Sequence, residues 1–211
     1  VLAFFPHRPV SSEHVPVTAK FGDSVTLPCD VEPYSLGIPE RKLHVFWETL
    51  DYCVYEFMGG KGYPDNRFQN RVEMSREKIS RVDLSLTVHH TTFSDGQIYT
   101  CYLIADKEHL LQRVDLAVLA HSEVHSLQPG ASLSHPLNTA GPAEVLFDPA
   151  GSVQSPRDFL SSAGLPGPGY EQRVSVQNSS LTLRSLIPVD RGSYTVRDLQ
   201  GNTISTVIVT V

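Results

Sequence analysis

Short runs of alternating apolar and polar residues are spread along the whole chain. Alternation covers 25–29, 82–88, 114–118 and 181–183, and a last segment, 204–211, is rich in β-branched residues. Each run is bounded by Gly, Pro, Asn, Asp or Ser, which is typical of half-buried strands in antiparallel sheets. No amphipathic helix longer than two turns is evident. The pattern therefore predicts an all-β chain built from antiparallel sandwiches.

The same set of sequence anchors occurs twice, in the same order. The anchors of the first half are 22–29, 45–48, 68–72 and 84–101, and those of the second half are 130–137, 145–148, 170–174 and 181–196. A chain of 211 residues has room for two small domains. We therefore predict two copies of one sandwich, a first domain over 1–119 and a second over 120–211.

The strand that closes each copy carries a family pattern. Residues 190–195 read Asp-Arg-Gly-Ser-Tyr-Thr, and Val196 follows where the closing strand of an immunoglobulin domain has cysteine. With the other anchors, this resembles the immunoglobulin superfamily, and the first half resembles its variable-type domain. The resemblance implies a disulfide between Cys29 and Cys101, with a buried Trp47 stacked on it.

The resemblance also implies features at the corner before the closing strand. Tyr99 is expected to donate a hydrogen bond to the backbone there, and Tyr194 is its counterpart in the second copy. The bottom of each sandwich is expected to be closed by an ion pair. These pairs are Arg71 with Asp95, and Arg173 with Asp190.

The second copy has no cysteine at the equivalent positions. Leu137 and Val196 stand there, and Phe147 stands at the position aligned with Trp47. A bridge closing a loop of this size contributes roughly 4 to 5 kcal/mol on the chain-entropy model. Burial of a Leu or a Val contributes roughly 1.5 to 3 kcal/mol each. Hydrocarbon can therefore replace the bridge, although His135, at the inward position of Leu27, is left unexplained.

A narrower resemblance covers about 15–119. Residues 53–61 and 65–72 include a strand, a Gly-Lys turn and an aromatic residue shortly before arginine, as in the butyrophilin and T-cell costimulatory ligand group. The third cysteine, Cys53, has two interpretations. It is either a half-buried thiol that acts as a small apolar residue, or one half of an intermolecular disulfide.

Charge and motifs argue against several function classes. The net charge of -6 is modest, so no nucleic-acid surface is expected. No nucleophile–base signature and no metal-ligand spacing occurs, so we expect no enzyme, cofactor or metal. The sequon at Asn178 and the expected disulfide favour the cell surface. Any membrane attachment is expected from a segment outside these residues, since no apolar run approaches the length of a membrane span.

Strand alternation predicts a binding face on the first domain. If Trp47 and Cys101 point inward, a set of largely apolar residues points outward on neighbouring strands, which is the composition of an interaction patch. This set is Phe46, Glu48, Ile98, Thr100, Tyr102 and Ile104, and Tyr55 and Phe57 are expected to extend it. The alternative is that some of them pack beneath a loop or the second domain.

The leading hypothesis is a cell-surface recognition protein that binds another cell-surface protein in trans, with the second domain as a spacer. A homophilic adhesion molecule, which would bind a second copy of itself through the same face, is an alternative. An intracellular structural array of immunoglobulin domains is a further one, because cysteine-free domains are ordinary there.

Overall fold

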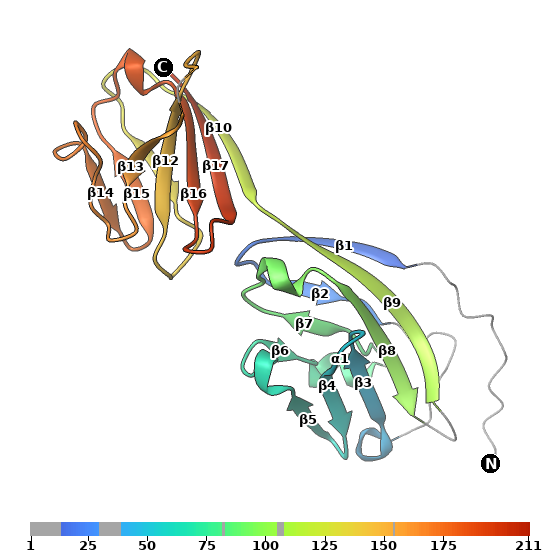
Figure 1. Ribbon diagram of the computed structural model, residues 1–211. Coiled ribbons are helices and arrows are strands. Elements are labelled where there is room, and N and C mark those ends of the chain that lie inside the picture. The colour runs from blue at the N-terminus through green and yellow to red at the C-terminus, as the bar shows by residue number, and fades with distance from the viewer. Residues whose placement is uncertain (1–13, 30–38, 82, 105–107, 154) are drawn as a thin grey trace. The chain divides into compact units, whose positions relative to one another are not determined.

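The computed structural model describes residues 14–29, 39–81, 83–104, 108–153 and 155–211. The chain divides into two compact units, Val1–Val118 and Leu119–Val211, which are described separately below. Figure 1 shows that each unit is built almost entirely of strands. No helix in the described ranges is both long and apolar enough to cross a membrane.

The first domain is a sandwich of a large and a small sheet (Figure 1). The large sheet has the strand order β1 (Val15–Lys20), β9 (Glu108–Leu119), β8 (Ile98–Ile104), β3 (His44–Glu48), β4 (Cys53–Met58) and β5 (Lys61–Pro64). The small sheet has the order β2 (Val25–Leu27), β7 (Leu86–Val88) and β6 (Val72–Glu73). The helices are short: α1 (Arg76–Ser80) and the 3-10 turns η1 (Glu40–Lys42), η2 (Asn66–Phe68) and η3 (Phe93–Asp95).

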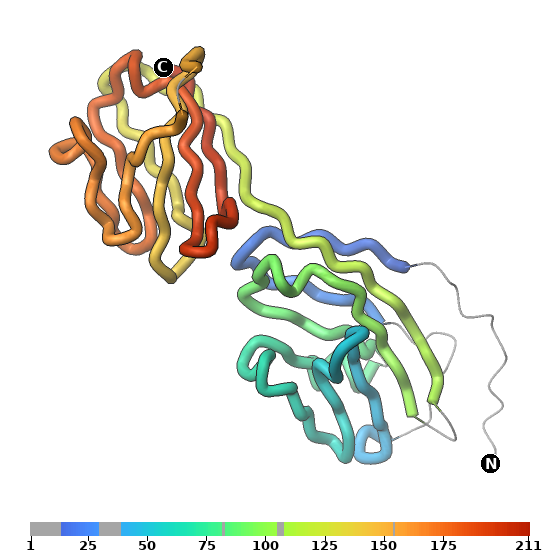
Figure 2. The backbone as a smooth tube through the Cα atoms, in the orientation of Figure 1, coloured from blue at the N-terminus to red at the C-terminus, as the bar shows by residue number. Residues whose placement is uncertain are grey.

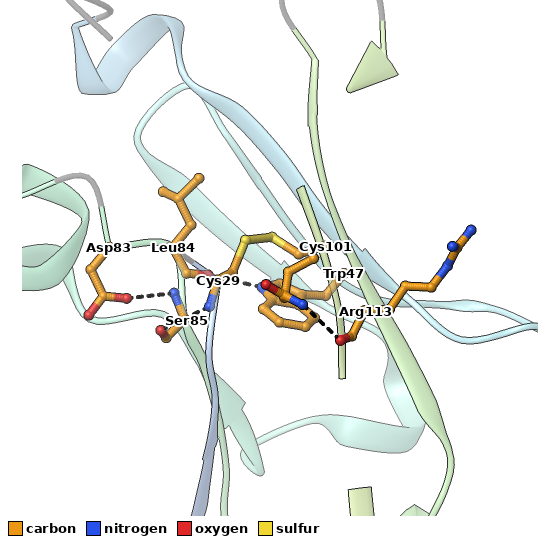
Figure 3. The surroundings of a disulfide bond; sticks show 8 residues. Cys29, Trp47, Asp83, Leu84, Ser85, Cys101 and Arg113 are labelled. Carbon is orange, nitrogen blue, oxygen red and sulfur yellow. Dashed lines mark hydrogen bonds between the residues drawn. A yellow bond between two sulfur atoms is a disulfide. The ribbon is translucent and has the colours of Figure 1, made fainter. Parts of the chain in front are cut away.

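The centre of the first domain holds the expected bridge. A disulfide joins Cys29, which follows β2, to Cys101 on β8, and both residues are fully buried. Trp47 lies opposite Cys101 in the β3–β8 pairing, and its indole Nε1 donates a 3.1 Å hydrogen bond to the carbonyl oxygen of Leu84. Figure 3 shows the indole close to the disulfide. The bridge therefore ties the two sheets together beside the largest aromatic residue.

The second domain has the same two-layer plan (Figure 2). One sheet has the order β10 (His121–Ser126), β17 (Thr203–Thr210), β16 (Gly192–Arg197), β12 (Glu144–Pro149) and β13 (Arg157–Leu160). The other has the order β11 (Leu133–Pro136), β15 (Ser180–Leu183) and β14 (Val174–Gln177), and a 3-10 turn, η4 (Pro188–Asp190), precedes β16. The expected fold class is confirmed, because the chain is all-β and the second domain has no disulfide. All three cysteines lie in the first domain, where Cys29 pairs with Cys101 and Cys53 is unpaired.

In the centre of the second domain, Phe147 does not occupy the position that corresponds to Trp47. Val145, and not Phe147, lies opposite Val196, while Phe147 lies opposite Tyr194. Phe147 is therefore one pleat away from the position that Trp47 has opposite Cys101. The prediction that Phe147 is the counterpart of Trp47 was wrong by two residues, because Val145 holds that position. The layer equivalent to the disulfide is aliphatic, and its residues Leu137, Val145 and Val196 are all buried.

The displaced Phe147 belongs to a cluster of four aromatic rings. Its ring stacks on that of Tyr194 with centroids 4.5 Å apart. Phe159, fully buried, packs edge-on against Tyr170 at 4.6 Å and against Tyr194 at 4.8 Å. Ring pairs in these arrangements add roughly 0.5–1.5 kcal/mol each beyond the burial of their area. The cluster therefore gives the second domain a packed centre of its own.

Both domains share the expected corner before the closing strand. The Tyr99 hydroxyl donates a 2.9 Å hydrogen bond to the carbonyl oxygen of Asp95, and the Tyr194 hydroxyl donates a 2.7 Å bond to that of Asp190. The carboxylates of these aspartates pair with Arg71 and Arg173, respectively. The same corner is thus built twice, independently of the core beside it.

Candidate partner-binding face

Alternation along β3 and β8 places the predicted outward residues on one surface of the large sheet. The inward residues of the two strands are buried: Val45 and Trp47 on β3, and Tyr99 and Cys101 on β8. The residues that alternate with them on each strand are half-buried. We call the outward set the front face. It consists of Phe46, Glu48, Ile98, Thr100, Tyr102 and Ile104.

Two aromatic rings form the middle of the front face. Phe46 and Tyr102 are paired across β3 and β8. Their rings stack with centroids 4.8 Å apart and an interplanar angle of 14°. Each ring covers one side of the other, which explains why both are half-buried although they point away from the core. The pair is a rigid apolar platform whose outer surfaces meet solvent.

Polar and charged residues surround this platform, and several were missed in the sequence. His44 also points outward on β3, and its Nε2 lies 2.7 Å from Oε1 of Glu56 on β4. On β9, Leu110 lies opposite Tyr102 and Arg113 lies opposite Thr100. The alternation that identified Phe46 also predicts His44. It does not predict the β9 residues, because a register shift interrupts the β8–β9 pairing beside Tyr102.

The expected extension of the face along β4 is wrong. Tyr55 and Phe57 are 7% and 2% exposed, and they point into the core. They lie opposite the inward residues Trp47 and Val45, respectively. The pairing of β3 with β4 has a register shift between Trp47 and Glu48, next to the turn that joins the two strands. Strict alternation counted across this turn therefore assigns the β4 residues to the wrong faces. The outward residue opposite Phe46 is Glu56.

A pocket of about 490 Å³ opens at one end of the front face. Its lining includes Tyr102 and Ile98 from the face, two acidic residues, Glu48 and Asp51, and the guanidinium-bearing Arg113. Burial raises the pKa of the Tyr102 hydroxyl, and the nearby Glu48 charge adds to this. Tyr102 therefore presents a neutral phenol at physiological pH. The pocket can receive a side chain that combines an apolar stem with a polar or charged end.

The turn between β3 and β4 borders this pocket. Leu50, at its tip, is 96% exposed, and both Leu50 and Cys53 contribute to the lining. An apolar side chain this exposed beside a pocket adds surface that a partner can bury.

Cys53 is exposed, so its interpretation as a half-buried apolar residue is wrong. Partial desolvation raises the pKa of its thiol, and the charge of Glu56 acts in the same direction. The thiol is therefore protonated at neutral pH and reacts slowly as a nucleophile. A disulfide to a partner stays a prediction.

The sequon lies on the second domain, in the hairpin between β14 and β15. Asn178 and Ser179 form its two-residue turn, and both have positive φ, 49° and 56°. Positive φ at both central residues is the geometry of a type I′ turn, which asparagine tolerates. Both residues are exposed, so the Asn178 amide is accessible to a glycan. Its glycosylation stays a prediction.

Comparison with known proteins identifies the family of the first domain. Residues 12–119 match the family model of the immunoglobulin V-set domain. A CD276 antigen homolog from Xenopus laevis is 26% identical over 136 residues, which are 63% of this chain and 40% of that protein, so the chain spans well under half of its length. A solved structure, the human B7-H4 IgV-like domain, is 21% identical over 50% of this chain and 94% of that domain, with a TM-score of 0.44.

Proposed function

The chain belongs to the immunoglobulin V-set family, and from this premise we propose that its first domain binds a cell-surface protein in trans through the front face. In this proposal the protein is an immune or cell–cell signalling ligand or receptor, and the second domain is a spacer. The similarity to a CD276 antigen homolog supports the immune assignment at the level of the group.

The stacked pair of Phe46 and Tyr102 is the observation that carries the proposal. Aromatic residues are enriched among those that dominate binding energies, because they bury large areas with little loss of side-chain entropy. In this pair the stacking already restricts both rings before a partner arrives. A platform that is ordered in advance lowers the entropic cost of association.

The surroundings of the pair have the organisation of an interface. The apolar centre is bordered by charged and polar residues: His44, Glu48, Glu56 and Arg113. This corresponds to an aromatic anchor with a polar rim that remains wet. Since two acidic residues, Glu48 and Asp51, outnumber the one arginine, Arg113, in the lining of the pocket beside the pair, a basic side chain of the partner is the favoured occupant.

The disulfide and the sequon support placement on the outside of the cell. A Cys29–Cys101 bridge is stable in an oxidising compartment, and an exposed Asn178 suits a glycan. The structural array inside the cell is disfavoured by the same bridge.

The test is to stain leukocytes with fluorescent tetramers of the ectodomain. Phe46→Glu and Tyr102→Glu each place a charge on the platform, and we expect each to abolish staining while the domain stays folded. Loss of the stacked pair, worth roughly 0.5–1.5 kcal/mol, should lower the melting temperature of the first domain by only several degrees. The matched control is Thr26→Glu, which places the same charge on an exposed residue of β2 in the opposite sheet. It should stain as the wild type does.

Staining that persists in both charged variants rejects the front face as the binding surface. Sedimentation of the ectodomain tests the homophilic alternative. If the protein dimerises and Tyr102→Glu makes it monomeric, the face binds a second copy of itself and the trans partner is not needed.

A further inference from the structure

The second domain contains an imidazole and carboxylate cluster that the binding proposal does not use. Glu123 and His125 lie two residues apart on β10, so their side chains are on the same face of the strand. His135 reaches the same place from β11. One ligand atom from each of the three residues lies within 4.8 Å of the other two. We propose that these residues bind a zinc ion, or a divalent transition metal of similar preference.

The distances match the geometry of a zinc site. His125 Nε2 lies 3.1 Å from Glu123 Oε2, and His135 Nδ1 lies 3.4 Å from the same oxygen. A tetrahedral zinc ion with bonds of about 2.0–2.1 Å separates its ligand atoms by roughly 3.3–3.4 Å. Each imidazole nitrogen therefore stands at nearly the required distance from the Glu123 oxygen, and the two nitrogens lie within 4.8 Å of each other. A small side-chain movement would bring all three atoms to the spacing that the ion requires.

The buried histidine carries a second, independent indication of a ligand. His135 is fully buried, and its Nδ1 has no hydrogen-bond partner in the described ranges, although the Glu123 carboxylate lies nearby. A buried polar atom without a partner costs free energy. A metal ion between Nδ1 and the carboxylate would satisfy both atoms. This also accounts for a histidine at a position where the first domain has the apolar Leu27.

The remaining nitrogen of His135 has the kind of contact that metal-binding histidines have. Its Nε2 lies 3.1 Å from the hydroxyl oxygen of Ser205 on β17. When Nε2–H donates to this hydroxyl, the lone pair of Nδ1 is directed to the cluster. Ser205 is itself buried, so it orients the ring.

The donor set selects the class of metal. Imidazole nitrogens with one carboxylate suit zinc and related ions, whereas calcium and magnesium prefer oxygen ligands. Three protein ligands leave a fourth position for water. The Glu123 and His125 side chains are 42% and 34% exposed, so an ion can enter from solvent.

The position of the cluster indicates what the ion would do. β10 is an edge strand of the larger sheet, and β11 is an edge strand of the smaller one. An ion bound to residues of both strands would join the two sheets at this edge. The second domain, which lacks the disulfide, would gain a cross-link of another kind.

The test is titration of the chelator-treated full chain with ZnCl2 alone, followed by calorimetry. We expect one saturable site per chain and a higher unfolding temperature for the second domain. Tryptophan fluorescence should detect no change in the first domain, because Trp47 is the only tryptophan. Glu123→Gln and His125→Ala change partly exposed side chains on an edge strand, so the fold should persist while zinc binding weakens by at least about 10-fold. Ser205→Ala should weaken binding by about 10-fold, as expected for a group that orients a ligand.

His44→Ala is the matched control. It removes a histidine that also contacts a carboxylate, 2.7 Å away, but lies in the first domain. It should bind zinc as the wild type does. Absence of saturable binding, or an affinity unchanged in both Glu123→Gln and His125→Ala, would overturn the proposal and leave the cluster as a network of polar contacts only. Glu123→Gln, His125→Ala and Ser205→Ala all lie in the second domain and leave the front face unchanged, so their outcome is independent of partner binding.

Discussion

In the first domain the two sheets are joined by a disulfide beside Trp47, whereas the second domain fills the same layer with Leu137, Val145 and Val196. The aromatic bulk of the second domain lies one pleat away, in the cluster around Phe159. The corners are alike: a tyrosine hydroxyl bonded to a backbone carbonyl, and an arginine–aspartate pair. The corner is therefore the invariant part of this scaffold, and the central brace is interchangeable.

The disulfide of the first domain and the buried apolar residues of the second stabilise their domains by similar free energies, but in different ways. The bridge contributes through the unfolded chain, by roughly 4 to 5 kcal/mol on the entropy model. The aliphatic and aromatic residues contribute through burial and ring contacts in the folded domain. The two domains should consequently be destabilised by different substitutions. Because both domains are part of one chain, their free energies of unfolding can be compared in the same sample.

Removal of the bridge is the largest expected effect. Cys29→Ala combined with Cys101→Ala should lower the free energy of unfolding of the first domain by about 4–5 kcal/mol, because the unfolded chain regains the freedom of a loop of 72 residues. Fluorescence of Trp47 measures this domain alone. Reductant added to the wild type should act in the same direction. A matching loss in the second domain would show that the two braces are not independent.

Replacement of one ring in the aromatic cluster is the next effect in size. Phe159→Leu keeps an apolar side chain but loses the contacts to Tyr170 and Tyr194, so we expect a loss of about 1–3 kcal/mol in the second domain. Calorimetry of the full chain measures it. The control is Phe68→Leu in the first domain, whose ring has a looser contact at 5.9 Å with Tyr52. An equal cost at both sites would argue against a special role of the cluster.

Sequence alone could predict the strands, the repeated scaffold and the outward residues of β3 and β8. Each of these follows from a period of two counted from a buried anchor, Trp47 or Cys101. The prediction was wrong where the period was interrupted. On β4, the neighbouring residues Val54 and Tyr55 are both buried, and no residue type in the turn indicates this.

The errors in the second domain have a different cause. Phe147 was matched to Trp47 by residue type, but strand pairing aligns positions by register, and register follows from hydrogen bonds that sequence does not display. The cluster with His135 was missed for a related reason. Its residues come from strands of two different sheets, so no fixed spacing along the chain identifies them.

The smallest expected effect concerns what the two domains share. Tyr99→Phe and Tyr194→Phe each remove one hydrogen bond at the corner, so each should lower the free energy of unfolding of its own domain by about 1 kcal/mol at pH 7. Phenylalanine keeps the ring in place. Because the corner is common to both domains, the two costs should agree closely, and a cost in one domain alone would contradict the shared role.

Alkaline pH sharpens this last test. Burial raises the pKa of both hydroxyls above the ordinary value of 10.0. The folded domain therefore holds a proton that the unfolded chain has released, so this part of the stability is complete below pH 10 and is lost as the pH rises beyond it. The loss is at most about 1.4 kcal/mol per pH unit for one hydroxyl. Unfolding of each phenylalanine variant, compared with wild type between pH 9 and 11 (about one unit on either side of the free tyrosine value), should show a shallower decline. Parallel declines in variant and wild type would mean that the corner hydroxyl does not govern this loss.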